Sequence, residues 1–189
     1  ASRFRAPRTG SRTGGEVAAL GAGAHPERGL GPGAGGGAPN SGAGGAGYGG
    51  RGGDYGGTSG GSAYGLTNAP LTAGSAGGYA GGNWQQSGCG GGLVWIEASG
   101  RVTIDGTLTA NGCKSGGTSS GAGAGGAILI SCGEFIGDSD ALLRADGKDG
   151  PWHTASSAWY GGGGGGGRIA VWQGVTPAIR STLISGLPP

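Results

Sequence analysis

The amino-acid sequence predicts an all-β fold, a parallel β-helix or β-solenoid, with extended glycine-rich segments of polyproline-II type. Three observations lead to this prediction: 55 Gly in 189 residues, internal repeats, and short apolar runs of period two inside those repeats. Each Gly in a regular element costs about 0.5–1 kcal/mol relative to Ala, so only repetitive pairing can offset the total. Composition alone favours disorder, but the strand-like runs argue against disorder in the second half.

The repeats indicate where rungs of the solenoid are expected. Residues 91–112 read GGLVWIEASGRVTIDGTLTANG, and residues 125–147 read GGAILISCGEFIGDSDALLRADG. A third copy is expected at about 166–186, and a fragment at 15–23 resembles the closing part of the same unit. Because repeats of this length are typical of stacked solenoid units, the sequence predicts about three incomplete rungs.

The first strand of each rung is expected directly after its leading glycines. Successive side chains of a strand point to opposite faces, so Val94 and Ile96 should share a buried ladder with their counterparts in the later copies. These counterparts are Ile128 and Ile130, then Ile169 and Val171. The opposite face is also apolar and includes Trp95, Leu129 and Trp172. Since strands apolar on both faces are buried on both sides, glycine-rich segments or neighbouring subunits should cover it.

Two further strands complete each predicted rung. Turn dipeptides at 99–100 and 105–106 divide the first copy into three short strands. The middle strand carries Val102 and Ile104 in the first copy, and Phe135 and Ile136 in the second. The third strand pairs Leu108 and Ala110 with Leu143 and Ala145, and Val17 and Ala19 are candidates to extend this ladder.

The chain is expected to have three parts: an Arg-rich arm at 1–14, a glycine-rich extended segment with a partial rung at 15–89, and β-helix repeats at 90–189. Residues 29–65 hold 19 Gly in 37 positions, and only Gly lets backbones approach without side-chain clash. Because of this close approach, these segments are expected to pack on the outside of the solenoid. They do not form a collagen helix, since the Gly-X-Y period is missing.

Several motifs follow one another in a specific order. They are GLGPGAGGG at 29–37, GAGGAGYGGRGG at 42–53, GGGLVWIEASGRVTIDGTLTANG at 90–112, GAGGAILISCGEF at 123–135 and GGGGGGGRIAVW at 161–172. In this order they resemble the glycine-rich repeat domains of very large secreted or cell-surface proteins of algae, oomycetes, choanoflagellates and bacteria. The resemblance covers roughly residues 14–172. It implies a right-handed parallel β-helix in an extracellular structural setting, and no catalytic residues.

Charge and hydropathy narrow the classes of partner. The formal net charge is +2, and the N-terminal arginines are expected to form a solvated terminus or an arm for an anionic polysaccharide. No aromatic-rich basic stripe follows, so nucleic acid is not expected as a partner.

No stretch approaches the ~20 apolar residues of a membrane span. The chain begins without Met and is expected to be a processed product or a piece of a longer one.

The three cysteines are Cys89, Cys113 and Cys132. Cys89 precedes the first strand and Cys113 follows the third, so one turn of a solenoid would bring both to the same corner. We expect these two to form a disulfide, which requires Cα atoms ~4.4–6.8 Å apart, and Cys132 to be buried. The alternatives are a cysteine bond to another chain, or that all three are small buried hydrophobes. No pair has CxxC spacing, so no metal site is expected.

Polar and aromatic residues favour a structural role over catalysis. Glycosidic chemistry needs two carboxyls ~5–9.5 Å apart across a groove, whereas Asp138 and Asp140 are expected in a turn. Trp152, Trp159 and Tyr160 lie between the second and third copies and are candidates for contacts with glycans or with other subunits.

We therefore expect a non-catalytic structural protein located outside the cell or at the cell surface. It would be a subunit or module of a filament, appendage or coat, assembled by glycine-mediated packing and β-sheet stacking, with itself or related structural subunits as partners. A carbohydrate-binding adhesion module, with glycans as partners, is the alternative. A polysaccharide-active β-helix enzyme and an ice-binding protein are less favoured, and no cofactor is expected.

Overall fold

The computed structural model describes residues 29–38, 41–81, 86–151 and 160–174. This described part contains strands and no helix, so it is all-β. Three expected features lie outside it: the arm at 1–14, the fragment at 15–23 and the end of the third copy at 175–186. The strands are β1 (Leu93–Glu97), β2 (Arg101–Ile104), β3 (Thr107–Thr109), β4 (Ala127–Cys132), β5 (Glu134–Gly137), β6 (Leu142–Arg144) and β7 (Arg168–Gln173).

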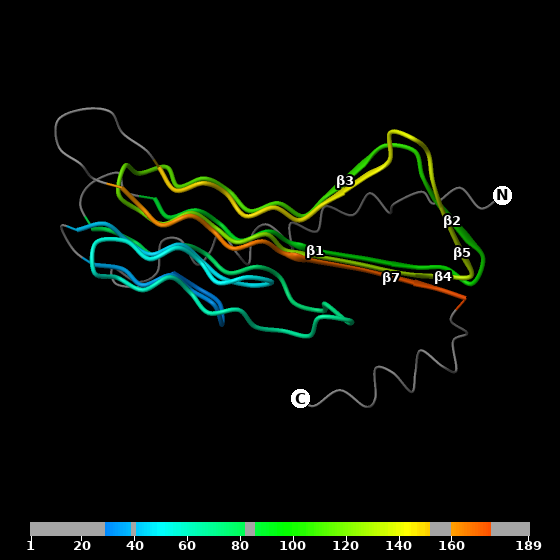
Figure 1. Ribbon diagram of the computed structural model, residues 1–189, viewed down its shortest axis with the longest axis horizontal. Coiled ribbons are helices and arrows are strands. Elements are labelled where there is room, and N and C mark those ends of the chain that lie inside the picture. Colours follow the sequence, from blue (N-terminus) through cyan, green and yellow to red (C-terminus); the bar gives the residue numbers. More distant parts are fainter. Residues whose placement is uncertain (1–28, 39–40, 82–85, 152–159, 175–189) are drawn as a thin grey trace, which may run out of the picture.

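All strand pairs are parallel, and each strand pairs with the one three places further along the chain. The sheets are β1-β4-β7, β2-β5 and β3-β6. The chain thus follows one path twice and begins it a third time, and the traces of these passages lie on one another in Figure 1. We call the passages coil 1 (86–113), coil 2 (119–148) and coil 3 (160–174). The described part of coil 3 contributes β7 alone, so these coils do not form a closed solenoid.

The apolar ladders predicted from the sequence are confirmed. Val94 lies opposite Ile128, which lies opposite Ile169, and the next ladder joins Ile96, Ile130 and Val171. The predicted pair Leu108 and Leu143 is also in register. In the middle sheet Val102 pairs with Phe135, but Ile136 lies opposite Thr103, one position away from Ile104.

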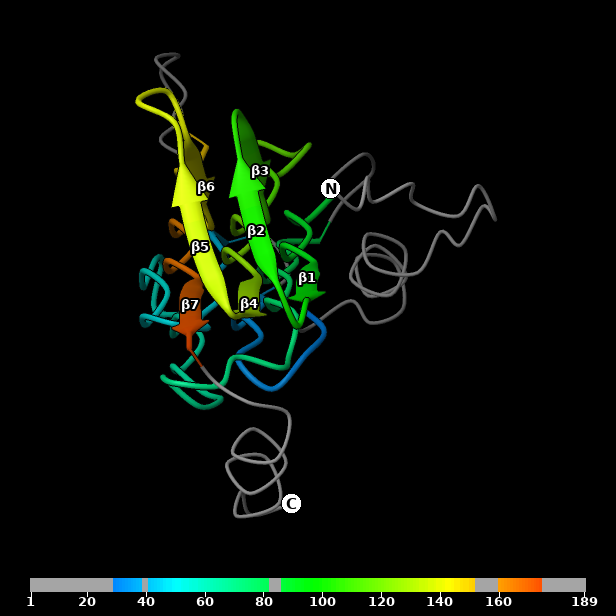
Figure 2. The same ribbon diagram turned by 90° about the vertical axis from the view of Figure 1, so that its right-hand side faces the viewer.

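The core lies between the sheets. Ile128, Ile130 and Cys132 of β4 have no exposed surface, and side chains of all three sheets pack around them. Figure 2 shows β2 and β5 side by side, above β1, β4 and β7 in that view. Because coil 2 has a coil on either side, β4 is buried along its whole length.

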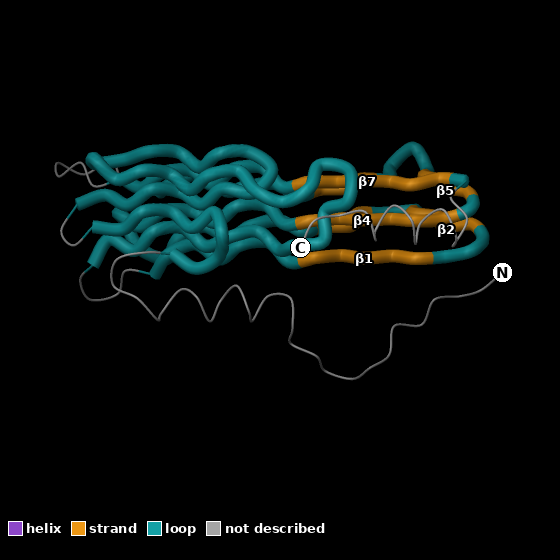
Figure 3. Tube along the Cα trace, turned by 90° about the horizontal axis from the view of Figure 1, so that it is seen from below, coloured by secondary structure: helices purple, strands orange, loops and turns teal. Residues whose placement is uncertain are grey.

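The glycine-rich segments run on from the sheets as a bundle of extended, wavy traces (Figures 1 and 3). Two of them, 42–48 and 119–126, are buried at every residue. Their position inside the bundle means that their peptide groups must find partners in neighbouring segments, because a buried peptide group without a partner is unfavourable.

Segment 42–48 bonds to its neighbours with a period of three residues. The amides of Ala43 and Ala46 donate to Ser119 and Ala122, those of Gly44 and Gly47 to Gly36 and Gly33, and that of Gly45 to Gly53. Its carbonyls accept from segments 61–64 and 162–165 and from Gly78. Among the described residues, six segments therefore surround this one, each bonded through the backbone.

Segment 119–126 has the same pattern. Gly121 and Ala124 donate to segment 75–78, Ala122 and Gly125 to segment 162–165, and Gly123 and Gly126 to segment 110–113. Its carbonyls accept from segments 43–46 and 88–91 and from Lys148. Such close packing requires Gly, because a Cβ on Gly123 would lie 1.8 Å from the carbonyl oxygen of Cys89.

The outer face of sheet β1-β4-β7 is covered in part by the glycine-rich half of the same chain. Leu129 is only 1% exposed. The guanidinium of Arg168 donates to the carbonyl of Tyr64 from Nε at 3.2 Å and from Nη2 at 3.0 Å. The indole of Trp172 donates to the carbonyl of Asn68 at 2.8 Å. Of the two coverings expected from the sequence, the described residues therefore provide the glycine-rich segments.

Candidate functional site

The predicted disulfide between Cys89 and Cys113 is present, with Cα atoms 5.0 Å apart. The amide of Cys113 also donates to the carbonyl of Cys89 at 2.8 Å. The same backbone contact recurs in coil 2, where Lys148 donates to Gly123 at 3.2 Å. In coil 1, the disulfide therefore reinforces the contact between the segment that leads into the first strand and the segment that follows the third strand. In coil 2, the backbone hydrogen bond alone makes the equivalent contact.

Cys132 is buried, as predicted, and it is free. Burial raises the pKa of its thiol, and a hydrogen bond with the backbone of Val102 opposes that shift. A buried thiol with a raised pKa is a poor nucleophile. Cys132 therefore belongs to the core.

The residues proposed for contacts with glycans or subunits have different surroundings. Trp95 is 49% exposed on β1, which lies at an edge of its sheet. Leu129 is buried and cannot meet a second molecule, so its place in this set was wrong, because sequence could not show that the chain covers it. Tyr160 packs edge-on against Tyr55, with ring centroids 5.7 Å apart. Trp152 and Trp159 lie outside the described residues.

Trp172 is half-buried, and its indole nitrogen is engaged by Asn68. Arg168, from the same strand, lies over the ring of Tyr48 at 5.7 Å from its centroid. Tyr48 in turn packs at 4.8 Å from the ring of Tyr64. This cluster attaches the glycine-rich bundle to the sheet, so Trp172 serves the fold of its own chain.

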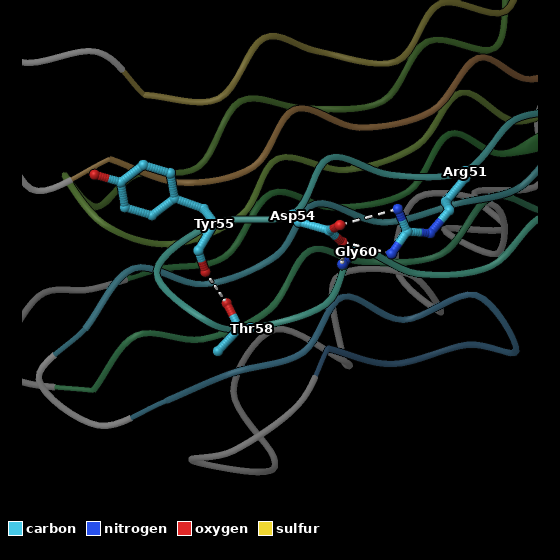
Figure 4. Close-up of polar contacts among 5 residues, drawn as sticks. All are labelled: Arg51, Asp54, Tyr55, Thr58 and Gly60. Atoms are coloured by element: carbon cyan, nitrogen blue, oxygen red, sulfur yellow. Dashed lines mark hydrogen bonds and ion pairs between the residues drawn. The ribbon is translucent and has the colours of Figure 1, made fainter.

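A polar turn at residues 51–60 was not found by the sequence reasoning (Figure 4). Arg51 binds both carboxylate oxygens of Asp54, at 3.0 and 2.5 Å, and Asp54 accepts the amide of Gly60 at 2.6 Å. The Gly60 amide, followed by the Arg51 guanidinium, lowers the pKa of Asp54. The sequence signal is Asp followed closely by Gly-Gly, since Gly56 and Gly57 have φ of 60° and 81°, as a type I′ turn requires.

This turn also lines a shallow hollow formed by residues 54–59. All the lining residues come from one turn, and the Asp54 carboxylate is already engaged.

Within the described ranges, no group of three or more His, Cys, Asp or Glu residues could hold a metal ion. The same part of the chain contains no helix that is long and apolar enough to cross a membrane.

The end of the stack at β7 exposes apolar residues that are buried elsewhere. Ile169 is 41% exposed and Val171 is 36% exposed, whereas their ladder partners Ile128 and Ile130 have no exposed surface. In the described part of the chain, β4 is the sole strand neighbour of β7. An exposed strand edge with apolar side chains can accept another strand, so this end is the best candidate for a functional surface.

Comparison of the chain with protein-family models, with curated proteins and with solved structures gave no match.

Proposed function

We propose that this chain is a non-catalytic structural protein that acts outside the cell, as a subunit or module of a surface filament, appendage or coat. The observation that carries the proposal is the glycine bundle, in which segments 42–48 and 119–126 are each bonded to six neighbours. Such packing uses the backbone itself as the contact surface. It builds a rigid body from residues that offer little side-chain chemistry.

The proposed architecture is a right-handed parallel β-helix joined to a bundle of polyproline-II-like segments. A hydrogen-bond period of three matches the three residues per turn of polyproline II, whose peptide groups are free to bond outward because the helix has no internal hydrogen bonds. The parallel sheets with strand order β1-β4-β7 support a helical path for the coils. The right hand follows from the general rule for parallel crossovers and from the family resemblance.

The proposed location outside the cell is supported by the disulfide between Cys89 and Cys113. Disulfides persist mainly in oxidising compartments. The partly exposed position of this bond makes the argument stronger, because reducing agents in a cytosol could reach Cys113.

A second candidate function, glycan binding at the cell surface, is favoured by one observation: the exposed ring of Trp95. Exposed aromatic rings are suitable platforms for sugars, because one face is apolar and the indole N–H is polar. Glycan-array binding that disappears on Trp95→Ala would support this function. If the unchanged chain bound no glycan on the array, this second function would be excluded.

The structural proposal is tested on the purified chain by electron microscopy and sedimentation over a range of concentrations. We expect fibres or sheets that grow with concentration and dissociate on dilution, and in native extracts the protein should be found in the surface or secreted fraction. Compact monomers at every concentration, together with no higher assembly in native extracts, would contradict the proposal.

A further inference from the structure

The coils are joined by backbone hydrogen bonds at a repeated position. Gly88 and Gly91 of coil 1 donate to Gly121 and Ala124 of coil 2, and Ala122 and Gly125 of coil 2 donate to Gly162 and Gly165 of coil 3. The strand register aligns each residue of one coil with a residue of the next coil. In both steps an amide donates to the carbonyl of the residue that comes just before its aligned residue. This pattern predicts which amides would bond to one additional coil.

By this rule, the next donors are the amides of Gly163 and Gly166 in coil 3. In the described part of the chain these two amides donate no hydrogen bond. Gly163 is half-buried and Gly166 is exposed. A Cβ on Gly166 would meet nothing within 4 Å, so there is free space beside this residue.

The opposite end of the stack has the matching acceptors. Gly121 and Ala124 accept from the preceding coil, and their register equivalents in coil 1 are Ser87 and Gly90. Within the described ranges, the carbonyls of Ser87 and Gly90 accept no hydrogen bond, and the Ser87 hydroxyl also has no partner. Both residues keep little exposed surface in the single chain, and a carbonyl or hydroxyl without a partner there is unfavourable, so a donor brought by the edge of a second coil would stabilise this end.

The apolar ladder is open at the same two ends. Ile169 and Val171 of β7 are exposed on the side that is core in coil 2, and β1 carries Val94 and Ile96, both half-buried, in the same alternation. The two edges belong to one parallel sheet, so they point in the same chain direction. A second copy can therefore continue the sheet without inversion.

Resting on the proposed structural function, we propose that copies of this chain stack head to tail, with β7 of one copy pairing in parallel with β1 of the next. The register follows that of β4 with β7: Val94 of the added copy lies opposite Ile169, and Ile96 lies opposite Val171. Gly163 and Gly166 then donate to the carbonyls of Ser87 and Gly90 in the added copy. Such a contact joins two different surfaces, so repeating it produces an open fibre.

The register is tested by cysteine cross-linking. Neighbouring strands lie ~4.8 Å apart, within disulfide range, so a Val94→Cys, Ile169→Cys chain should give a ladder of covalent multimers on mild oxidation. Within one chain β4 separates these positions, which prevents an internal bond. The control pair Ile96→Cys, Ile169→Cys is two residues out of register and should give no multimers beyond those of the unchanged chain.

A second variant tests the surface itself. Val171→Arg should abolish fibres while the variant remains a folded monomer with an unchanged melting temperature, because this side chain is partly exposed in the single chain. Leu142→Arg is the matched control, because Leu142 is 45% exposed but lies outside the ladder of Ile96, Ile130 and Val171. This variant should form fibres as the unchanged chain does.

The outcomes separate the two proposals. Fibres without cross-links in the matched pair would overturn this register and leave the structural function standing. The absence of fibres from the unchanged chain would instead contradict the structural function. A large loss of melting temperature in monomeric Val171→Arg would also overturn the stacking, because it would mean that the chain itself covers β7.

Discussion

Gly121 and Gly44 lie in backbone contact at the centre of the bundle: a Cβ on Gly121 would be 1.9 Å from the carbonyl oxygen of Gly44. The neighbouring atom is backbone and is itself held by a hydrogen bond from the amide of Gly78, so it cannot move aside easily. We predict that Gly121→Ala lowers the free energy of unfolding by about 3 kcal/mol or more, at the upper end of the usual overpacking cost. Denaturant unfolding followed by circular dichroism would measure it.

The matched control for that substitution is Gly106→Ala, where an added Cβ meets nothing within 4 Å. Replacing Gly by Ala at a compatible position stabilises by about 0.4–1 kcal/mol through the unfolded state. Equal effects at Gly121 and Gly106 would contradict the close packing of the bundle.

Removing the disulfide should destabilise the chain measurably. The bond between Cys89 and Cys113 closes a loop with a sequence separation of 24, for which the expected contribution is about 3 kcal/mol. We predict this loss for the Cys89→Ser, Cys113→Ser double variant in thermal unfolding. Adding a reductant should lower the stability of the unchanged chain to the same level and leave the double variant unaffected.

Arg168 should contribute more to stability than an ordinary surface arginine. It makes two hydrogen bonds to the carbonyl of Tyr64 and lies over the ring of Tyr48. We predict that Arg168→Ala costs about 1.5–3 kcal/mol, the range for hydrogen bonds to charged groups. Arg168→Lys should recover part of this, because Lys keeps the charge and loses the planar fork.

The comparison for Arg168 is Arg144→Ala, which removes an exposed ion pair with Asp146. Exposed pairs contribute about 0–1 kcal/mol. If the two alanine variants were equally stable, Arg168 would not attach the bundle to the sheet.

The turn at 51–60 should depend on pH through Asp54. Its pKa is lowered from 3.8, first by the Gly60 amide and then by Arg51. A lowered folded pKa means that the stabilising contact is complete above pH 3.8 and is lost as the pH falls through the folded pKa. We predict that the amide resonance of Gly60 titrates below pH 3.8 and that Asp54→Asn abolishes this titration.

Arg51→Gln is the control for the cause of that shift. Because the Gly60 hydrogen bond is the largest single cause, the pKa of Asp54 should stay below its ordinary value in this variant. An Asp54 carboxyl that titrates at its ordinary value in Arg51→Gln would reverse the order of the two causes.

The ladder of Val94, Ile128 and Ile169 could be predicted because period-two apolar residues fix both the strands and their register. The pairing of Cys89 with Cys113 followed from their positions, one before the first strand and one after the third strand of the same rung. The middle strand was less certain, since Phe135 and Ile136 are adjacent in the sequence and alternation does not say which faces the core. The contacts show that Val102 lies opposite Phe135.

The order of segments in the glycine bundle could not be predicted. Side chains usually show which faces meet, and a run such as Gly161–Gly167 has none. One signal was available: Ala43 and Ala46 are three residues apart, and their amides point to the same neighbouring segment. The contacts of Arg168 with Tyr64 could not be predicted either, because they join residues 104 positions apart without any repeat.

The three-residue period of the bundle also limits how its sequence can evolve. Each amide from Gly121 to Gly126 points to one of three neighbours in turn. Deleting one residue there would rotate every later amide by about a third of a turn, toward a segment whose acceptors face elsewhere. Insertions and deletions inside the bundle should therefore survive selection in multiples of three, whereas the turns between segments are free to vary in length.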